Sequence, residues 1–138
     1  MIEAVRDYVK KCPFLDELSN LDVDYLDHEA TNYSINALPG DTVIKKYADG
    51  GEIRQYNFAV SSRSFYGKDV KTNIENLDFF FKFGEWVEGN NKNKVFPKLA
   101  EKSYPQEVKV LTDGYLLSAD METGRYQVQC KLIYYKEV

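Results

Sequence analysis

The residue types that most often carry catalysis or bind metals are scarce and scattered in this chain. His28 is the only histidine, and Cys12 and Cys130 are the only cysteines. Nucleophilic catalysis usually needs a histidine base, and a zinc site needs several Cys or His ligands, so neither has a convincing residue set here. We therefore expect no catalytic residue, no metal site and no cofactor, and a protein that is not an enzyme.

The carboxylates and glycines support the same expectation. No pair of acidic residues has a spacing typical of acid–base catalysis, and residues 120–124 lack the ligand pattern of a calcium loop. Gly50 and Gly51 lie between two β-rich runs, which favours a hairpin turn over a phosphate-binding loop. The two cysteines have neither CxxC nor metal-ligand spacing, so we interpret both as partly buried thiols.

Length and composition indicate one domain over residues 1–138. The chain is 43% apolar and 14% aromatic, which is ample for a packed core. Eighteen basic and twenty-two acidic residues give a net charge of −4, so no global field attracts nucleic acid or an anionic membrane. No signal peptide and no apolar run of about 20 residues is apparent, which predicts a soluble intracellular protein without a membrane partner.

The periodicity of apolar residues predicts one helix before the strands and a longer helix between the third and fourth strands. We expect a helix at 2–11, a short helical turn around 14–18 and a long helix at 68–88. Strands are expected at 33–38, 42–48, 52–62, 106–118 and 125–136, with Gly114 marking a bulge and residues 95–105 irregular. This order predicts an α+β fold, a small mainly antiparallel sheet with helices packed on one face.

The long helix carries more apolar surface than one core face can use. Its first stripe is the expected core face and comprises Val70, Ile74, Leu77 and Phe81. A second stripe, Phe79, Phe83 and Trp86, falls roughly opposite on the same helical wheel. Either the N-terminal helices cover this second stripe within the subunit, or it contacts another subunit or partner.

Two further features suggest binding. One face of the predicted sheet carries amides and cations without an acid, namely Gln55, Asn57, Arg125, Gln127, Gln129 and Lys131. This face is either the solvated side of a half-buried sheet or a surface that looks onto a polyanion. Phe65 and Tyr66 lie at a junction between strand and helix, where they either pack under the sheet or contact a neighbour.

Several blocks of the sequence resemble small structural proteins of phages that infect Gram-positive hosts. The blocks are residues 1–8, 12–16, 25–26, 29–35, 44–47, 73–76 and 125–135. Together they spread over nearly the full chain. The family they resemble is often labelled minor capsid proteins and is similar to the tail terminators of long-tailed phages and prophages.

This resemblance implies a structural role in the virion. Six small α/β subunits would form a ring that caps the tail tube, ends its polymerisation and presents a surface to the head. The implied partners are other copies of the chain, the tail-tube protein and a head-completion protein. The implied location is the phage tail or neck, with the host cytoplasm as the place of assembly.

The resemblance also implies roles for the features above. Phe79, Phe83 and Trp86, with Phe65 and Tyr66, would contact a neighbouring subunit, since a head-to-tail interface repeats until the ring closes. Gln127, Gln129 and Lys131 would line a lumen through which DNA passes without specific binding.

Three other classes of protein compete with this interpretation. Another head–tail connector or a tail-tube subunit would use the same kind of domain, and a tube subunit would form filaments. An intracellular adaptor or inhibitor that binds a host protein through the aromatic helix face would stay monomeric. A small hydrolase would need a base with a perturbed pKa, for which the sequence offers no obvious candidate.

Overall fold

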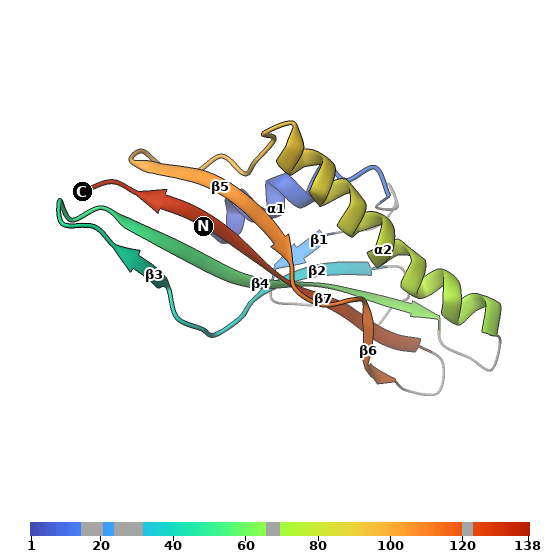
Figure 1. The fold of residues 1–138 in the computed structure, drawn as a ribbon. Helices are drawn as coiled ribbons and strands as arrows, with labels where there is room; N and C mark the ends of the chain where they lie inside the picture. The colour runs from blue at the N-terminus through green and yellow to red at the C-terminus, as the bar shows by residue number, and fades with distance from the viewer. Residues whose placement is uncertain (15–20, 24–31, 66–69, 120–122) are drawn as a thin grey trace.

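The chain forms an α+β fold, as the order of predicted elements indicates (Figure 1). The computed structural model describes residues 1–14, 21–23, 32–65, 70–119 and 123–138. The helices are α1 (Ile2–Lys10) and α2 (Val70–Lys92). The strands are β1 (Leu21–Val23), β2 (Asn32–Ala37), β3 (Val43–Lys46), β4 (Glu52–Phe65), β5 (Ser103–Val110), β6 (Tyr115–Ala119) and β7 (Thr123–Lys136).

Two long antiparallel strands, β4 and β7, form the centre of a seven-stranded sheet. They pair over their full length, from Glu52 opposite Lys136 to Phe65 opposite Thr123. The other side of β4 pairs with β2 and β3, and the other side of β7 pairs with β5 and β6. Every pair is antiparallel except β1 with β2. The strands β3 and β5 therefore lie at opposite edges of the sheet.

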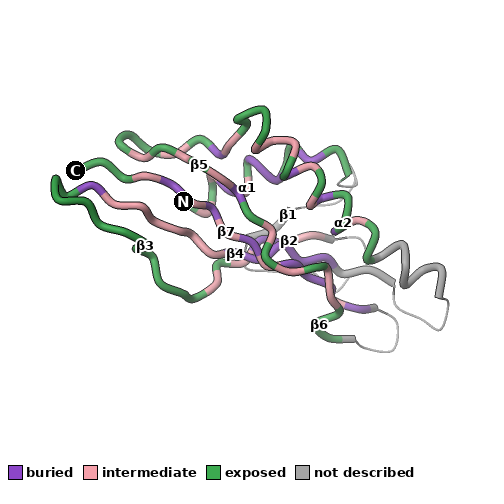
Figure 2. Tube along the Cα trace, viewed as in Figure 1, coloured by how far each residue is buried: buried purple, intermediate pink, exposed green. Residues whose placement is uncertain are grey.

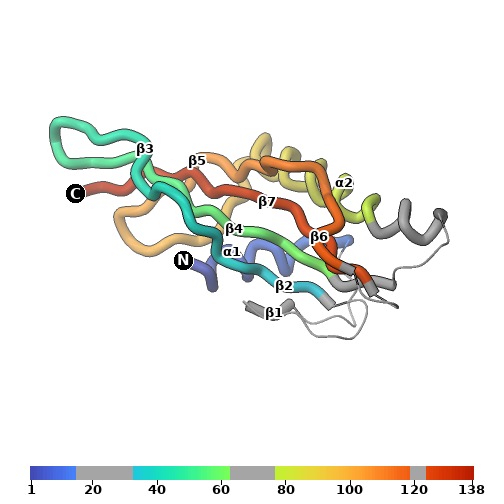
Figure 3. The backbone as a smooth tube through the Cα atoms, turned by 90° about the horizontal axis from the view of Figure 1, so that it is seen from below, coloured from blue at the N-terminus to red at the C-terminus, as the bar shows by residue number. Residues whose placement is uncertain are grey.

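Both helices pack on one face of this sheet, and the core lies between the two layers (Figure 3). The predicted alternation along the last strand is confirmed, because every second residue of β7 from Tyr126 to Tyr134 is buried in the core. The register places Ile35, Val60 and Val128 side by side on that inner face. Burial of these side chains removes apolar surface from water, which is the main driving force for the fold.

The sheet extends beyond the layer of helices at one end (Figures 1 and 2). There β3 and the start of β4 form a projecting hairpin, which we call the arm and define as residues 43–55. The predicted turn at 49–51 is confirmed, since the Tyr47 N–H donates to the Gly51 carbonyl at 2.8 Å and Asp49 Oδ1 accepts from the Gly51 N–H at 2.9 Å. Residues 39–50 are all exposed, so no other described part of the subunit covers the β3 side of this hairpin, whereas residues 52–55 pair with β7.

The predicted strand 106–118 is instead two strands, β5 and β6, with a break at residues 111–114. Gly114 lies in this break, and a Cβ atom there would stand 2.7 Å from the Cβ of Phe80. The chain therefore turns where Phe80 of α2 lies directly against it. β5 begins at Ser103, inside the segment predicted to be irregular, and α2 continues to Lys92 past the predicted end. Residues 15–18 of the predicted helical turn lie outside the described residues.

Candidate interaction surfaces

The helix α2 buries the stripe that the sequence suggested for a partner. Phe83 is 0% exposed, and Phe80 and Val87 are also buried in the core. Phe79 and Trp86 are partly buried and pack against that core. Phe83 therefore cannot contact a neighbouring subunit, and its predicted interface role is corrected to a place in the core of the same subunit. Phe79 and Trp86 stay partly exposed, so their contact with a neighbouring subunit remains a prediction.

Aromatic rings from the first part of the chain cover this stripe. The ring of Tyr8 in α1 lies 5.1 Å from that of Trp86, and the ring of Tyr33 in β2 lies 5.0 Å from that of Phe79, between centroids. Such tilted pairs add stabilisation beyond their buried area. The alternative in which the N-terminal part of the subunit covers the second stripe is thus the one observed.

The two residues of the predicted core stripe whose side chains are described lie instead on the surface. Phe81 is 66% exposed and Leu77 is 40% exposed. The side chains of Val70 and Ile74 lie outside the described part of the structure, as do Tyr66 and the side chain of Phe65. The surplus of apolar surface on this helix is real, but the exposed residues are Leu77 and Phe81.

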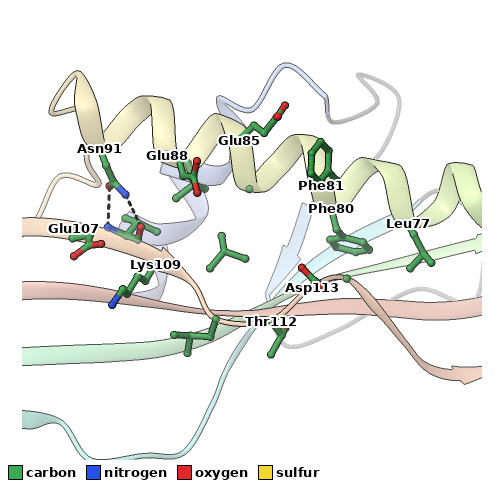
Figure 4. Close-up of a pocket in the computed structure, with 16 residues that line it drawn as sticks. Leu77, Phe80, Phe81, Glu85, Glu88, Asn91, Glu107, Lys109, Thr112 and Asp113 are labelled. Atoms are coloured by element: carbon green, nitrogen blue, oxygen red, sulfur yellow. Dashed lines mark hydrogen bonds between the residues drawn. The ribbon is translucent and has the colours of Figure 1, made fainter.

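The exposed stripe borders a groove of about 940 Å³ between α2 and the edge of the sheet (Figure 4). One wall is formed by residues 77–91 of α2 and the other by residues 107–114, which include the end of β5 and the break before β6. Leu111, 48% exposed, adds a third accessible apolar side chain to Leu77 and Phe81. Exposed apolar side chains along a groove are typical of an interaction site.

Two glycines shape the groove in opposite ways. Gly84 lies in α2 one turn after Phe80 and Phe81, and a Cβ atom there would meet nothing within 4 Å. Gly114 lies on the opposite wall, where a Cβ atom would clash with Phe80. The two walls of the groove are therefore apart at Gly84, whereas at Gly114 they are in contact through Phe80.

Carboxylates dominate the charge around the groove. Four acidic residues line it, namely Glu85, Glu88, Glu107 and Asp113, whereas Lys109 is its one cation. Figure 4 shows Asp113 directed toward the helix and Glu85 directed outward at the rim. No ion pair found among the described residues includes any of these carboxylates. The groove therefore combines exposed apolar side chains with carboxylates.

The side chain of Asn91 closes one end of the groove and caps the edge of β5 (Figure 4). Asn91 Nδ2 donates to the Val108 carbonyl at 2.8 Å, and the Val108 N–H donates to Asn91 Oδ1 at 3.1 Å. The amide thus pairs with the strand as another strand would. An edge with its N–H and C=O groups satisfied is protected from strand addition at that residue.

The arm carries a second exposed apolar surface, on the other edge of the sheet. In β3 all four residues are exposed, including Val43 and the 50% exposed Ile44. Lys45 and Lys46 follow, and Lys45 Nζ lies 5.0 Å from the centre of the Tyr47 ring. In the neighbouring strand β4, Arg54 and Glu52 pair with each other at 2.7 Å. β3 itself contains two lysines and no acid, so its net charge is positive.

The polar face of the sheet, opposite the helices, is less open than the sequence suggested. Gln127 is only 7% exposed, because its Oε1 accepts from the Ser61 hydroxyl at 3.2 Å and its Nε2 donates to the Tyr115 hydroxyl. Gln129 Nε2 donates to the same hydroxyl at 3.1 Å. The expectation that Gln127 faces a lumen is therefore corrected, whereas Gln129 and Lys131 remain partly accessible.

The residues first considered for chemistry do not form a site among the described residues. Cys12 and Cys130 are both buried and are thiols. In the part of the chain that is described, no three His, Cys, Asp or Glu side chains lie close enough to hold a metal ion. His28 lies outside the described residues. Neither described helix has the length and apolar character needed to cross a membrane.

The groove carboxylates and the β3 residues were not among the site residues predicted from sequence. One signal does mark the exposed face of α2: the stripe through Leu77 and Phe81 continues at helical spacing to Glu85 and Glu88, which favour solvent. Nothing local marks the anionic margin of the groove, because it joins residues from α2 and from the end of β5.

Comparison with known proteins adds no assignment. No protein-family model matches the chain, and no curated protein matches its sequence.

Proposed function

We propose that the protein is a structural virion component that forms a ring on the end of a phage tail tube. The ring ends polymerisation of the tube and forms the surface to which the head joins. Its partners in this role are other copies of the chain, the tail-tube protein and a head-completion protein. The protein then resides in the tail or neck of the virion, and in the host cytoplasm during assembly.

One observation carries this proposal. Two separate surfaces with exposed apolar residues, the groove beside α2 and the arm, lie at opposite edges of one sheet. A head-to-tail contact needs two different surfaces on each subunit, and such contacts produce a ring when the rotation between subunits closes. The resemblance of the sequence blocks to tail terminators supports the same role.

A ring in this position would surround the DNA as it leaves the head. The outer face of the sheet bears on this part of the proposal, because the amides of Gln127 and Gln129 are engaged with Tyr115 and are not free to read bases. Lys131 lies opposite Lys109 in the register of β7 and β5. The net charge of the chain is −4, so DNA would pass without specific binding because its phosphates are repelled by the protein as a whole.

The experiment is to add the purified protein to purified tail tubes that lack their terminal ring. Electron microscopy should show the protein at one end of each tube and an end to further growth of the tube. A tube-length distribution that is unchanged by the protein would contradict the proposal. Incorporation along the whole tube would indicate the alternative of a tail-tube subunit.

A second candidate function, that of an adaptor or inhibitor, is favoured by one specific observation. The exposed Phe81 and Leu77 beside the groove suit an adaptor or inhibitor that binds another intracellular protein. Such a protein would be monomeric at every concentration and would not bind tail tubes.

A further inference from the structure

We propose that the arm of one copy docks in the groove of the next copy, with Lys45 and Lys46 facing the carboxylates at the groove margin. This inference rests on the proposed function, because it names the two surfaces through which the ring would be built. The occupant of the groove is therefore a second copy of this chain.

The apolar surfaces of the two sites are matched in kind. The arm offers Val43 and Ile44, both exposed on a strand that no described residue covers. The groove offers Leu77, Phe81 and Leu111, which are also exposed in the single subunit. Contact between them would remove both apolar surfaces from water at once, and such burial favours association.

The charges of the two sites are opposite. β3 contains two lysines and no acid, and Asp41 and Asp49 flank the strand without lying in it. The groove margin contains Glu88, Glu107 and Asp113, with Glu85 at its outer rim and Lys109 as the single cation. Complementary charges of this kind guide the encounter and suppress wrong registers.

The positions of the two sites exclude contact within one subunit and suit contact between subunits. β3 pairs with β4 at one edge of the sheet, and β5 pairs with β7 at the other. The arm is also held in shape, because its turn is hydrogen bonded and the Gln55 N–H donates to the Thr42 carbonyl at 2.7 Å. A preformed arm loses little conformational freedom when it docks.

Reversal of charge tests this contact. The arm variant combines Lys45→Glu with Lys46→Glu, and the groove variant combines Glu88→Lys with Asp113→Lys. Each variant alone should lose the high-mass species that the wild-type protein forms, as measured by light scattering, because the arm would meet a groove of its own charge sign. Circular dichroism should show that both variants stay folded, since all four residues are exposed.

Mixing the two variants is the decisive step. In a one-to-one mixture the acidic arm meets the basic groove, and the basic arm of the other variant meets the acidic groove. Copies should therefore alternate, and the high-mass species should return to the wild-type mass. A matched control, Lys10→Glu with Lys11→Glu, reverses two adjacent exposed lysines at the end of α1 and should leave assembly unchanged.

The outcomes separate this inference from the proposed function. If both variants form wild-type rings, or if the mixture fails to restore them, the docking of arm in groove is overturned while the ring stands. If charge reversal and rescue occur but the species are filaments, the contact is correct and the role as a terminator is overturned. A wild-type protein that is monomeric at all concentrations and is not recruited to the end of tail tubes overturns both.

Discussion

Replacing either of two glycines on opposite walls of the groove by alanine should change the stability of the protein, but in opposite directions. Gly114→Ala would place a Cβ atom 2.7 Å from Phe80, so the chain or the ring must shift. We expect a loss of about 1–3 kcal/mol in the free energy of unfolding, the usual cost of overpacking. Urea unfolding of the wild type and of the Gly114→Ala variant measures this loss of stability.

The matched control is Gly84→Ala, where the added atom meets nothing within 4 Å. Alanine favours a helix over glycine by about 1 kcal/mol, so this variant should be more stable than the wild type. Equal effects of the two substitutions would contradict the account of the groove walls.

The buried thiol of Cys130 should make stability fall at alkaline pH. Burial raises the pKa of this thiol well above its ordinary value, so the folded state keeps the proton that the unfolded state releases above about pH 8.5. The free energy of unfolding should therefore decrease between pH 8.5 and 10, by up to about 1.4 kcal/mol per pH unit from this group. Below pH 8.5 the group has no effect.

Urea titrations at several pH values on the wild type and on Cys130→Ala test this prediction. The variant loses packing at all pH values, but its stability should fall less steeply than that of the wild type above pH 8.5. Every other titrating group contributes to both proteins, so parallel slopes would show that the thiol titrates normally in the folded state.

At the scale of single elements, the sequence predicted the strands better than the faces of the long helix. The alternation in β7 is unambiguous, because polar and apolar residues occupy separate faces, and its core-facing set is as predicted. In α2 both stripes are apolar around residues 77–86, so the local pattern does not decide which stripe is buried. Rings from α1 and β2 decide it, and their contacts are long-range.

The break between β5 and β6 is another feature that local pattern could not supply. Gly114 did indicate an irregularity in the predicted strand. The break coincides with the close approach of Phe80, some thirty residues earlier in the chain. The groove depends on that approach, so its carboxylates could not be grouped from sequence either.

The two faces of α2 should therefore differ sharply when truncated. Phe83→Ala removes a ring that is 0% exposed and should cost about 3–5 kcal/mol in the free energy of unfolding. Phe81→Ala removes a ring that is 66% exposed and should change stability by less than about 1 kcal/mol. Thermal or urea unfolding compares them directly.

The same pair of variants also separates folding from association. Because Phe81 borders the groove, Phe81→Ala should weaken assembly while leaving the subunit folded. A stability loss at Phe81 as large as that at Phe83 would mean that the exposed stripe belongs to the core after all.

At the scale of the whole molecule, a compact two-layer body carries an arm that its own helices do not cover (Figure 2). Tyr47 and Tyr104 each lie near Tyr135, with centroid distances of 6.1 and 6.3 Å, so the arm and the start of β5 are joined across β7. The arm therefore projects as a firm extension of the sheet. Such a shape is suited to insertion into a neighbour, and the groove at the opposite edge provides a receiving surface.

The central claim is that the subunits associate head to tail into a closed ring. The most direct test is the absolute mass of the protein in solution, measured by light scattering over a concentration series, with negative-stain microscopy of any large species. We expect a closed ring of about six subunits with a central opening and no filaments. A strict monomer at every concentration, or open filaments that lengthen with concentration, would contradict it.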